Sequence, residues 1–150
     1  MSDHDRFFRA AADVTREALA AGSDQPFGAA LVRNGEIVVA CANSMAADTD
    51  PTAHAELLAV RKGAKKLGTL DLSDCFVYAT GQPCPMCTAA MIWAGIPTVY
   101  YATPAALAHE RGYSDVHVRD YLAGRDDSAI IEVHVPGRAE CDEFWSKAGS

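Results

Sequence analysis

The sequence lacks long hydrophobic runs, and it lacks an excess of basic residues. Its most apolar stretch, residues 89–96, is far shorter than the roughly 20 residues that a helix needs to cross a bilayer. Lysine and arginine together number 13 against 20 aspartates and glutamates, which gives a net charge of −7. Tight binding to nucleic acid normally depends on basic side chains that neutralise phosphates. We therefore expect neither membrane insertion nor a nucleic-acid partner.

The sequence also lacks the features of secreted, disordered and repetitive proteins. Its start, residues 1–6, has neither the basic end nor the apolar segment of a signal peptide, so we expect a cytoplasmic protein. Hydrophobic residues make up 49% and charged residues 22%, the balance of a globular chain. With 150 residues and no repeat or linker, the chain fits one domain, residues 1–150, whose core needs no disulfides.

The spacing of apolar residues predicts alternating helices and strands. Asn34-Gly35 lies between two apolar runs and is a strong signal for a β-hairpin. The predicted elements in chain order are a helix over 7–19, hairpin strands over 27–32 and 36–41, a helix over 51–66 with Asp50 as N-cap, a strand over 75–80, a helix over 84–94, a strand over 98–102, a partly helical segment over 104–122, a strand over 129–135 and a helix over 140–147. This order predicts an α/β fold, a three-layer α/β/α sandwich with a mixed five-stranded sheet.

One short motif, residues 82–87 (QPCPMC), lies at the start of a predicted helix. Cys84 and Cys87 are three positions apart, so they share a helix face and their sulfurs can converge on one metal ion. The partial positive charge of a helix N-terminus favours their thiolate forms. The motif therefore predicts two metal ligands.

A second motif, residues 52–56 (TAHAE), lies at the start of another predicted helix. His54 and Glu56 are two positions apart, about 200° around a regular helix, so both border one metal only if it lies at the helix end. One imidazole and two thiolates match a catalytic zinc site, in which water takes the fourth position. We therefore predict one Zn²⁺ per subunit, held by His54, Cys84 and Cys87, with Glu56 as the carboxylate that moves protons.

The combination H-x-E…P-C-x-x-C is typical of zinc-dependent nucleobase deaminases. The alternative is a closed, non-enzymatic zinc site with Cys41 or Cys75 as fourth ligand. In that case Glu56 is an ordinary surface carboxylate. His109 has no partner at ligand spacing, so no role is predicted for it.

At these motifs the chain resembles the cytidine-deaminase-like superfamily, and within it the bacterial guanine deaminases of that fold. The resemblance spans nearly the whole chain and includes residues 26–29 (PFGA), Asn43, 50–56 (DPTAHAE), 83–87 (PCPMC) and 91–94 (MIWA). It implies a homodimer and a pocket for a flat base. The residues it assigns to base contact are Asn43 through a hydrogen bond, Phe27, Ala55 and Trp93 as pocket lining, and Asp115 as a purine contact that assists proton transfer.

Each of these residues also has a purely structural interpretation. Phe27 and Trp93 fit core packing, Asn43 fits an Asx-turn, and Asp115 fits a turn cap. The chain departs from the guanine deaminases at Gln82, where the family commonly has Glu. It also ends soon after residues 144–145 (FW), whereas the family closes its pocket with a longer tail. Isocytosine, cytosine and an aminotriazine are therefore alternative substrates.

The sequence thus predicts a zinc-dependent hydrolase that replaces an exocyclic amine of a free nucleobase with oxygen and releases ammonia. Guanine to xanthine is the leading case. A tRNA adenosine deaminase has the same zinc site, but it needs a basic rim that an acidic chain does not suggest.

Overall fold

The structure, a computed structural model, describes residues 1–145 and divides into two compact units. The first unit, Met1–Asp115, contains all four strands of the described chain. The second unit begins at Val116 and is described as far as residue 145. The expectation of one domain over residues 1–150 stays a prediction.

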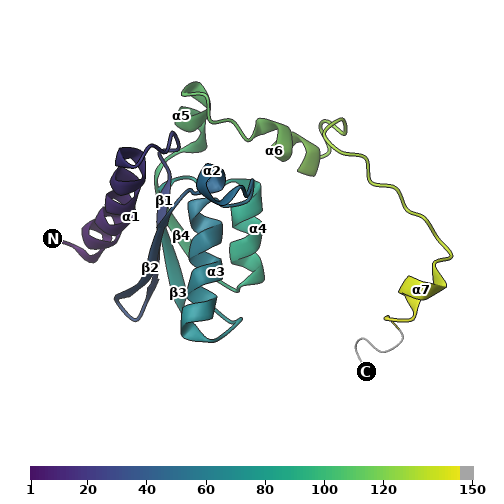
Figure 1. Ribbon diagram of the computed structural model, residues 1–150, viewed down its shortest axis with the longest axis horizontal. Helices are drawn as coiled ribbons and strands as arrows, with labels where there is room; N and C mark the ends of the chain where they lie inside the picture. The colour runs from purple at the N-terminus through teal and green to yellow at the C-terminus, as the bar shows by residue number, and fades with distance from the viewer. Residues whose placement is uncertain (146–150) are drawn as a thin grey trace. The chain divides into compact units, whose positions relative to one another are not determined.

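The first unit is built around a mixed sheet with the strand order β2-β1-β3-β4 (Figure 1). Its strands are β1 (Gly28–Arg33), β2 (Glu36–Ala42), β3 (Cys75–Gly81) and β4 (Thr98–Thr103). β1 is antiparallel to β2 and to β3, whereas β3 and β4 are parallel. The parallel pair is joined through helix α4 (Pro85–Trp93), which confirms the predicted strand–helix–strand crossover.

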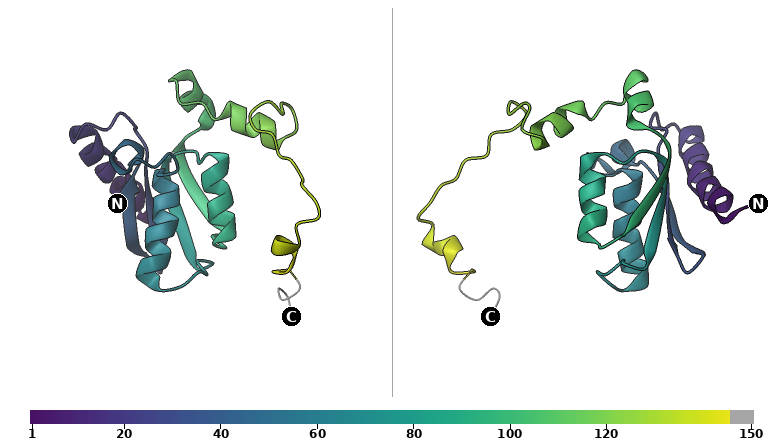
Figure 2. Two further views of the ribbon diagram at one scale, coloured as in Figure 1. Left: turned by 45° about the vertical axis from the view of Figure 1, so that its right-hand side comes forward. Right: turned by 180° about the vertical axis from the view of Figure 1, so that it is seen from behind.

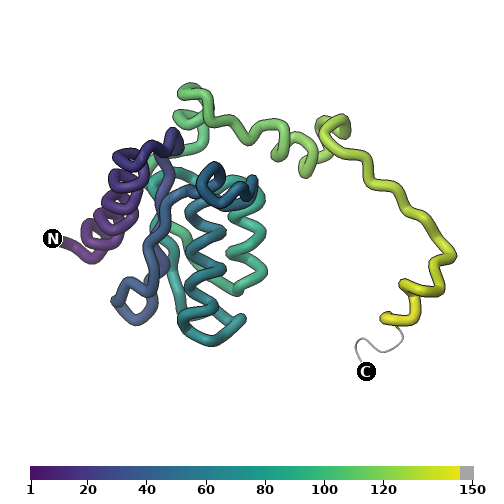
Figure 3. The backbone as a smooth tube through the Cα atoms, in the orientation of Figure 1, coloured from purple at the N-terminus to yellow at the C-terminus, as the bar shows by residue number. Residues whose placement is uncertain are grey.

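The hairpin of β1 and β2 turns at Asn34 and Gly35, whose φ angles are 50° and 74°. Two positive φ angles are what a two-residue hairpin turn of the favoured hand requires, and Asn-Gly supplies them at low strain. Figure 3 traces this tight turn. At the opposite end of the hairpin, the N–H of Asn43 donates to the carbonyl of Phe27 at 3.1 Å, so two predicted base contacts lie side by side.

Helices cover both faces of this sheet (Figures 1 and 2). Helix α1 (Asp3–Ala20) packs on one face, and α3 (Ala55–Leu67) packs with α4 on the other. Because neighbouring side chains of a strand point to opposite faces, Leu31 joins the core under α3 while Val32 packs against Phe7 of α1. The predicted α/β fold with a mixed sheet is confirmed.

The predicted count of five strands is wrong. In the described chain, residues 129–135 belong to no strand, and the side chains of Ile131 and Val133 are 82% and 73% exposed. Alternating apolar residues show that a segment suits a half-buried strand, but a strand forms only beside a partner that completes its backbone hydrogen bonds. In place of the predicted helix over 140–147, the structure has the short helix α7 (Ala139–Asp142). Residues 146 and 147 of the predicted helix lie outside the described residues.

Three further short helices complete the described chain. The unpredicted α2 (Met45–Asp48) follows the hairpin, and the partly helical segment over 104–122 contains α5 (Ala105–Glu110) and α6 (Val116–Leu122). No helix in residues 1–145 is long and apolar enough to cross a membrane.

Candidate active site

His54 lies at the tip of α3, because this helix begins later than the sequence suggests. The predicted N-cap, Asp50, instead accepts hydrogen bonds from the N–H and the hydroxyl of Thr52 at 2.8 and 2.7 Å. Residues 50–52 therefore form a turn and do not begin the helix. His54 is the N-cap and has an extended backbone. Glu56 follows in the first helical turn. Both residues therefore border the helix end, as their spacing requires.

Cys84 and Cys87 lie at the start of α4. Cys84 is the N-cap, Pro85 takes the first helical position, and Cys87 is fully buried in the first turn. Proline is well suited to this position because the first N–H of a helix has no partner within the helix. α3 and α4 pack against one another, so their N-terminal ends bring His54 and the two cysteines together.

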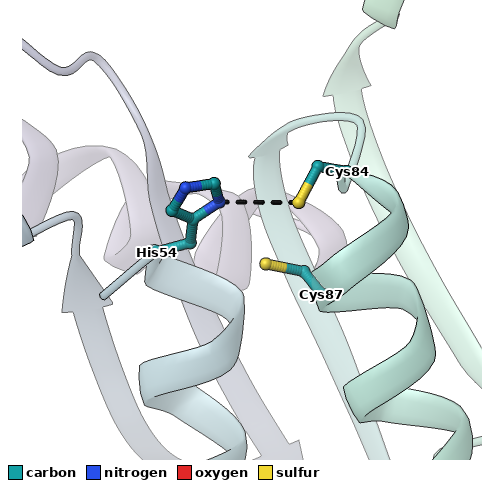
Figure 4. Close-up of side chains that lie close together, drawn as sticks. All are labelled: His54, Cys84 and Cys87. Atoms are coloured by element: carbon teal, nitrogen blue, oxygen red, sulfur yellow. Dashed lines mark hydrogen bonds between the residues drawn. The ribbon is translucent and has the colours of Figure 1, made fainter. Parts of the chain in front are cut away.

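The three predicted ligands converge on one point (Figure 4). Nδ1 of His54 is 3.5 Å from Sγ of Cys84, and the ligand atoms of His54, Cys84 and Cys87 all lie within 4.8 Å of one another. Tetrahedral zinc places sulfur and nitrogen ligands about 3.5 Å apart. The donor types and their spacing therefore fit zinc.

No fourth ligand completes this cluster in the part of the chain that the structure describes. Cys41 packs in a separate apolar cluster with Ala53 and Leu58. The thiol of Cys75 donates to Oδ1 of Asp74 at 3.5 Å, and burial raises its pKa to about 11. Neither cysteine joins the ligand set, which contradicts the closed-site alternative and leaves three ligands, as in catalytic zinc sites.

Hydrogen bonds within the cluster shift the pKa values of its three residues. Donation from Cys87, with a further hydrogen bond to His54, lowers the pKa of Cys84 to about 4. The pKa of Cys87 is raised, because its thiol donates to Cys84 and is buried. The hydrogen bond to Cys84 in turn raises the pKa of His54. The thiolate form of Cys84, which is the form that binds a metal ion, is therefore favoured.

Glu56 lies beside the ligands but outside their cluster. It is a buried carboxyl group, only 4% exposed, and it lines the same pocket as His54 and Cys84. Burial raises the pKa of Glu56, because a charged carboxylate loses hydration there. A buried carboxyl group with a raised pKa can both accept and return a proton, as a general acid–base catalyst must.

These groups open into a pocket of about 260 Å³ in the first unit. Among the predicted base contacts, Phe27, Asn43 and Asp115 line it together with His54, Glu56 and Cys84. Its remaining lining residues are Gln25, Gln82, Ala105, Ala108, His109, Gly112, Tyr113 and Ser114. The structure therefore joins the hairpin end, the two helix tips and the segment after β4 in one site.

Asn43 is held in one orientation at the pocket. It is 7% exposed, and its Oδ1 accepts a hydrogen bond of 2.7 Å from the N–H of Ala55. With its oxygen engaged, its amide group is left to donate. The methyl group of Ala55 lies in the hydrophobic core and does not line the pocket. Ala55 therefore positions Asn43 through its backbone and adds no side chain to the pocket wall.

Trp93, predicted to line the pocket, is not among the residues that line it in the described chain. Its side chain is 90% exposed at the last residue of α4. It lies nine residues after Cys84, which is about 13 Å along a helix. The motif that contains Trp93 is near the ligands in sequence but not in space.

His109, for which the sequence predicted no role, lines the pocket, and so does Gln82, which the sequence marked only as a departure from the guanine deaminases. Nε2 of His109 is 2.8 Å from Oδ1 of Asp115, and Oε1 of Gln82 accepts from the N–H of Ala105 at 2.8 Å. The signal for the first pair was a histidine six residues before a predicted acidic contact, with Gly112 as a turn residue between them.

Comparison with known proteins identifies the family. Residues 1–103 match the model of the cytidine and deoxycytidylate deaminase zinc-binding region. This chain belongs to that family. The deaminase is 41% identical to a guanine deaminase from Bacillus subtilis over 113 residues. This aligned region covers 75% of this chain and 72% of the relative. It is therefore a hydrolytic deaminase with zinc as its cofactor.

The deaminase also resembles a solved structure of the family and enzymes of the family that act on tRNA. The X-ray structure of guanine deaminase from Bacillus subtilis matches it with a TM-score of 0.88 and 34% identity, over 97% of this chain and 93% of that chain. A tRNA-specific adenosine deaminase from Agrobacterium fabrum is 38% identical over 127 residues, 78% of this chain and 84% of the relative.

Proposed function

We propose that this deaminase hydrolyses guanine to xanthine and ammonia. The observation that carries the proposal is the buried carboxyl group of Glu56 beside three residues placed to hold zinc, in a pocket of about 260 Å³. This volume is at or below the roughly 300–1,000 Å³ of pockets for drug-sized ligands, so it suits a free base. Several residues between 105 and 115 line one side of the pocket. The family model ends at residue 103, whereas the match to the Bacillus subtilis guanine deaminase structure covers 97% of this chain and so includes this segment.

In the proposed reaction, His54, Cys84 and Cys87 hold zinc, which when bound supplies Lewis-acid activation of a water molecule. Glu56 accepts a proton from this water as its oxygen attacks the amine-bearing carbon. Glu56 then returns the proton to the adjacent ring nitrogen. The second proton of the former water then moves from the new hydroxyl group to the amine, carried by Glu56 with assistance from Asp115. The carbonyl forms as the carbon–nitrogen bond breaks, and ammonia leaves.

The pocket residues that bind the base complement guanine. The free amide N–H groups of Asn43 suit the acceptors O6 and N7 that guanine presents along one edge. The rings of Phe27 and Tyr113 pack edge to face, with their centroids 5.3 Å apart, and give the base an apolar surface to pack against. Together these residues hold the base by one edge and one face.

A tRNA substrate is the second candidate, because relatives of that activity match the chain. The net charge of −7 disfavours an RNA backbone. Ammonia release by zinc-loaded protein should be measured with guanine, isocytosine, cytosine, adenine, ammeline, cytidine and guanosine, and a gel shift should test tRNA. Guanine turnover far above the rest supports the proposal. Preference for another base, or activity on tRNA alone, overturns guanine as the proposed substrate.

We also propose that the enzyme is a cytoplasmic homodimer. Ile92 and Trp93 of α4 are 71% and 90% exposed, and adjacent large apolar side chains of this kind favour a protein interface. All five cysteines are free, which suits a reducing compartment. Analytical ultracentrifugation tests the dimer, and Trp93→Glu should shift the protein to monomer if α4 forms the contact.

A further inference from the structure

We propose that His109 is a positioning residue that fixes the carboxylate of Asp115 for the reaction. The proposal deepens the proposed function and rests on it. Nε2–H of His109 donates to Oδ1 of Asp115 at 2.8 Å, and both side chains line the pocket. Their side chains are only 26% and 19% exposed, so water competes less for this bond than for one on the surface.

Asp115 lies in the segment that follows α5. α5 ends at Glu110, and Gly112, with φ at 93°, reverses the chain before residues 113–115. A hydrogen bond to a carboxylate narrows the set of rotamers that the side chain samples. The bond to His109 links this carboxylate to a helix and restricts its rotation.

The helix that carries His109 is itself anchored beside the metal ligands. At the first residue of α5, the N–H of Ala105 donates to Oε1 of Gln82 at 2.8 Å, and Gln82 lies two residues before Cys84. Three residues beyond the end of α5, the hydroxyl of Tyr113 donates to the carbonyl of Asp24 at 3.0 Å. α5 is thus held at its first residue, and the segment that follows it is held at Tyr113, so His109 places Asp115 at a defined position relative to the zinc ligands.

Three variants test the positioning role in zinc-loaded protein. His109→Leu removes the donor, His109→Gln retains an N–H donor of similar reach, and Glu110→Ala changes the exposed neighbour on the same helix. Loss of orientation at a reacting group costs about 10- to 100-fold in rate. We expect His109→Leu to lower kcat by this factor with little change in KM, while His109→Gln stays within about 3-fold of the parent. Glu110→Ala should match the parent enzyme.

A double-mutant cycle separates positioning from a general structural role. If His109 acts through Asp115, His109→Leu should have no further effect on kcat in an Asp115→Asn background. An additive effect of the two changes overturns the proposal. The positioning role requires that His109→Leu keep the melting temperature and the zinc content of the parent. A lower value of either one contradicts the proposal.

A readout without turnover distinguishes this proposal from the proposed function. In NMR spectra of zinc-loaded protein, the Nε2–H of His109 should exchange slowly with solvent, and Asp115→Asn should increase its exchange rate. A parent enzyme inactive on every free base overturns the proposed function, whatever the NMR result. An active parent whose His109→Leu variant keeps its kcat overturns only the positioning role.

Discussion

The N–H of Ala55 donates a hydrogen bond of 2.7 Å to Oδ1 of Asn43. This bond joins the end of the β1–β2 hairpin to the first residue of α3, directly after His54. It therefore places the side chain proposed to bind the base at a fixed distance from a zinc ligand. Base binding and metal binding are connected through a single backbone group.

Two substitutions of Asn43 separate its two functions. Asn43→Asp keeps an acceptor for Ala55 but loses the donor to guanine, so kcat/KM should fall while the melting temperature holds. Asn43→Ala also leaves the N–H of Ala55 without this acceptor, which should lower the free energy of unfolding by about 1–3 kcal/mol. Steady-state kinetics and urea unfolding check both, and an Asn43→Asp enzyme with full activity on guanine contradicts the assigned contact.

Glu56→Gln should bind zinc and lose activity. The amide keeps the shape of the carboxyl group but cannot carry the proton, and general acid–base catalysis contributes about 10²- to 10⁴-fold. We expect kcat to fall by that factor, with zinc content by atomic absorption equal to that of the parent. Glu17→Gln, on the exposed side of α1, is the control. Comparable turnover by Glu56→Gln would falsify the role of Glu56.

Cys84→Ser should lose zinc, because a hydroxyl is a poor substitute for a thiolate ligand. Deamination and metal content should fall together, and a chelator should produce the same loss in the parent enzyme. Cys141→Ser is the matched control, since Cys141 is exposed and lies outside the ligand cluster. Full zinc occupancy in Cys84→Ser argues against the ligand set.

Gln82→Glu should preserve activity, because a carboxylate oxygen accepts from the N–H of Ala105 as the amide oxygen does. Gln82→Ala removes this acceptor at the start of α5 and should lower kcat, by loosening the helix that carries His109. Kinetics on guanine for both variants check the prediction. Equal activity of Gln82→Ala and the parent shows that this hydrogen bond does not support the pocket.

Leu72→Ala and Leu70→Ala form a matched pair for core stability. Leu72 is fully buried in the core cluster, whereas Leu70, two residues earlier, is 91% exposed. Removing a buried leucine side chain costs about 2–5 kcal/mol, since apolar contacts are lost and a cavity remains. An exposed one changes the free energy of unfolding by about 0.5 kcal/mol or less. Urea denaturation of zinc-loaded protein should show this difference; equal midpoints contradict the packing.

Local sequence patterns predicted the elements whose signals are contained in a few neighbouring residues. The hairpin at Asn34-Gly35 forms because both residues tolerate positive φ, whatever surrounds them. The start of α3 was predicted four residues too early, because Asp50 is as good a turn residue as it is an N-cap. Residues 129–135 have the pattern of a strand, but pattern alone does not supply a pairing partner.

By itself, the sequence determined the zinc chemistry, since the ligand types and the spacing of Cys84 and Cys87 restrict the metal and its geometry. Only the tertiary structure decided which distant residues join them. Asn43 and Asp115 reach the pocket, and His109 arrives beside Asp115, whereas Trp93 is carried away along α4. The physical reason is that ligand spacing within one turn is a local property of the helix. The pocket wall depends on how helices, strands and loops pack, and that packing places residues far apart in sequence within one hydrogen bond of each other.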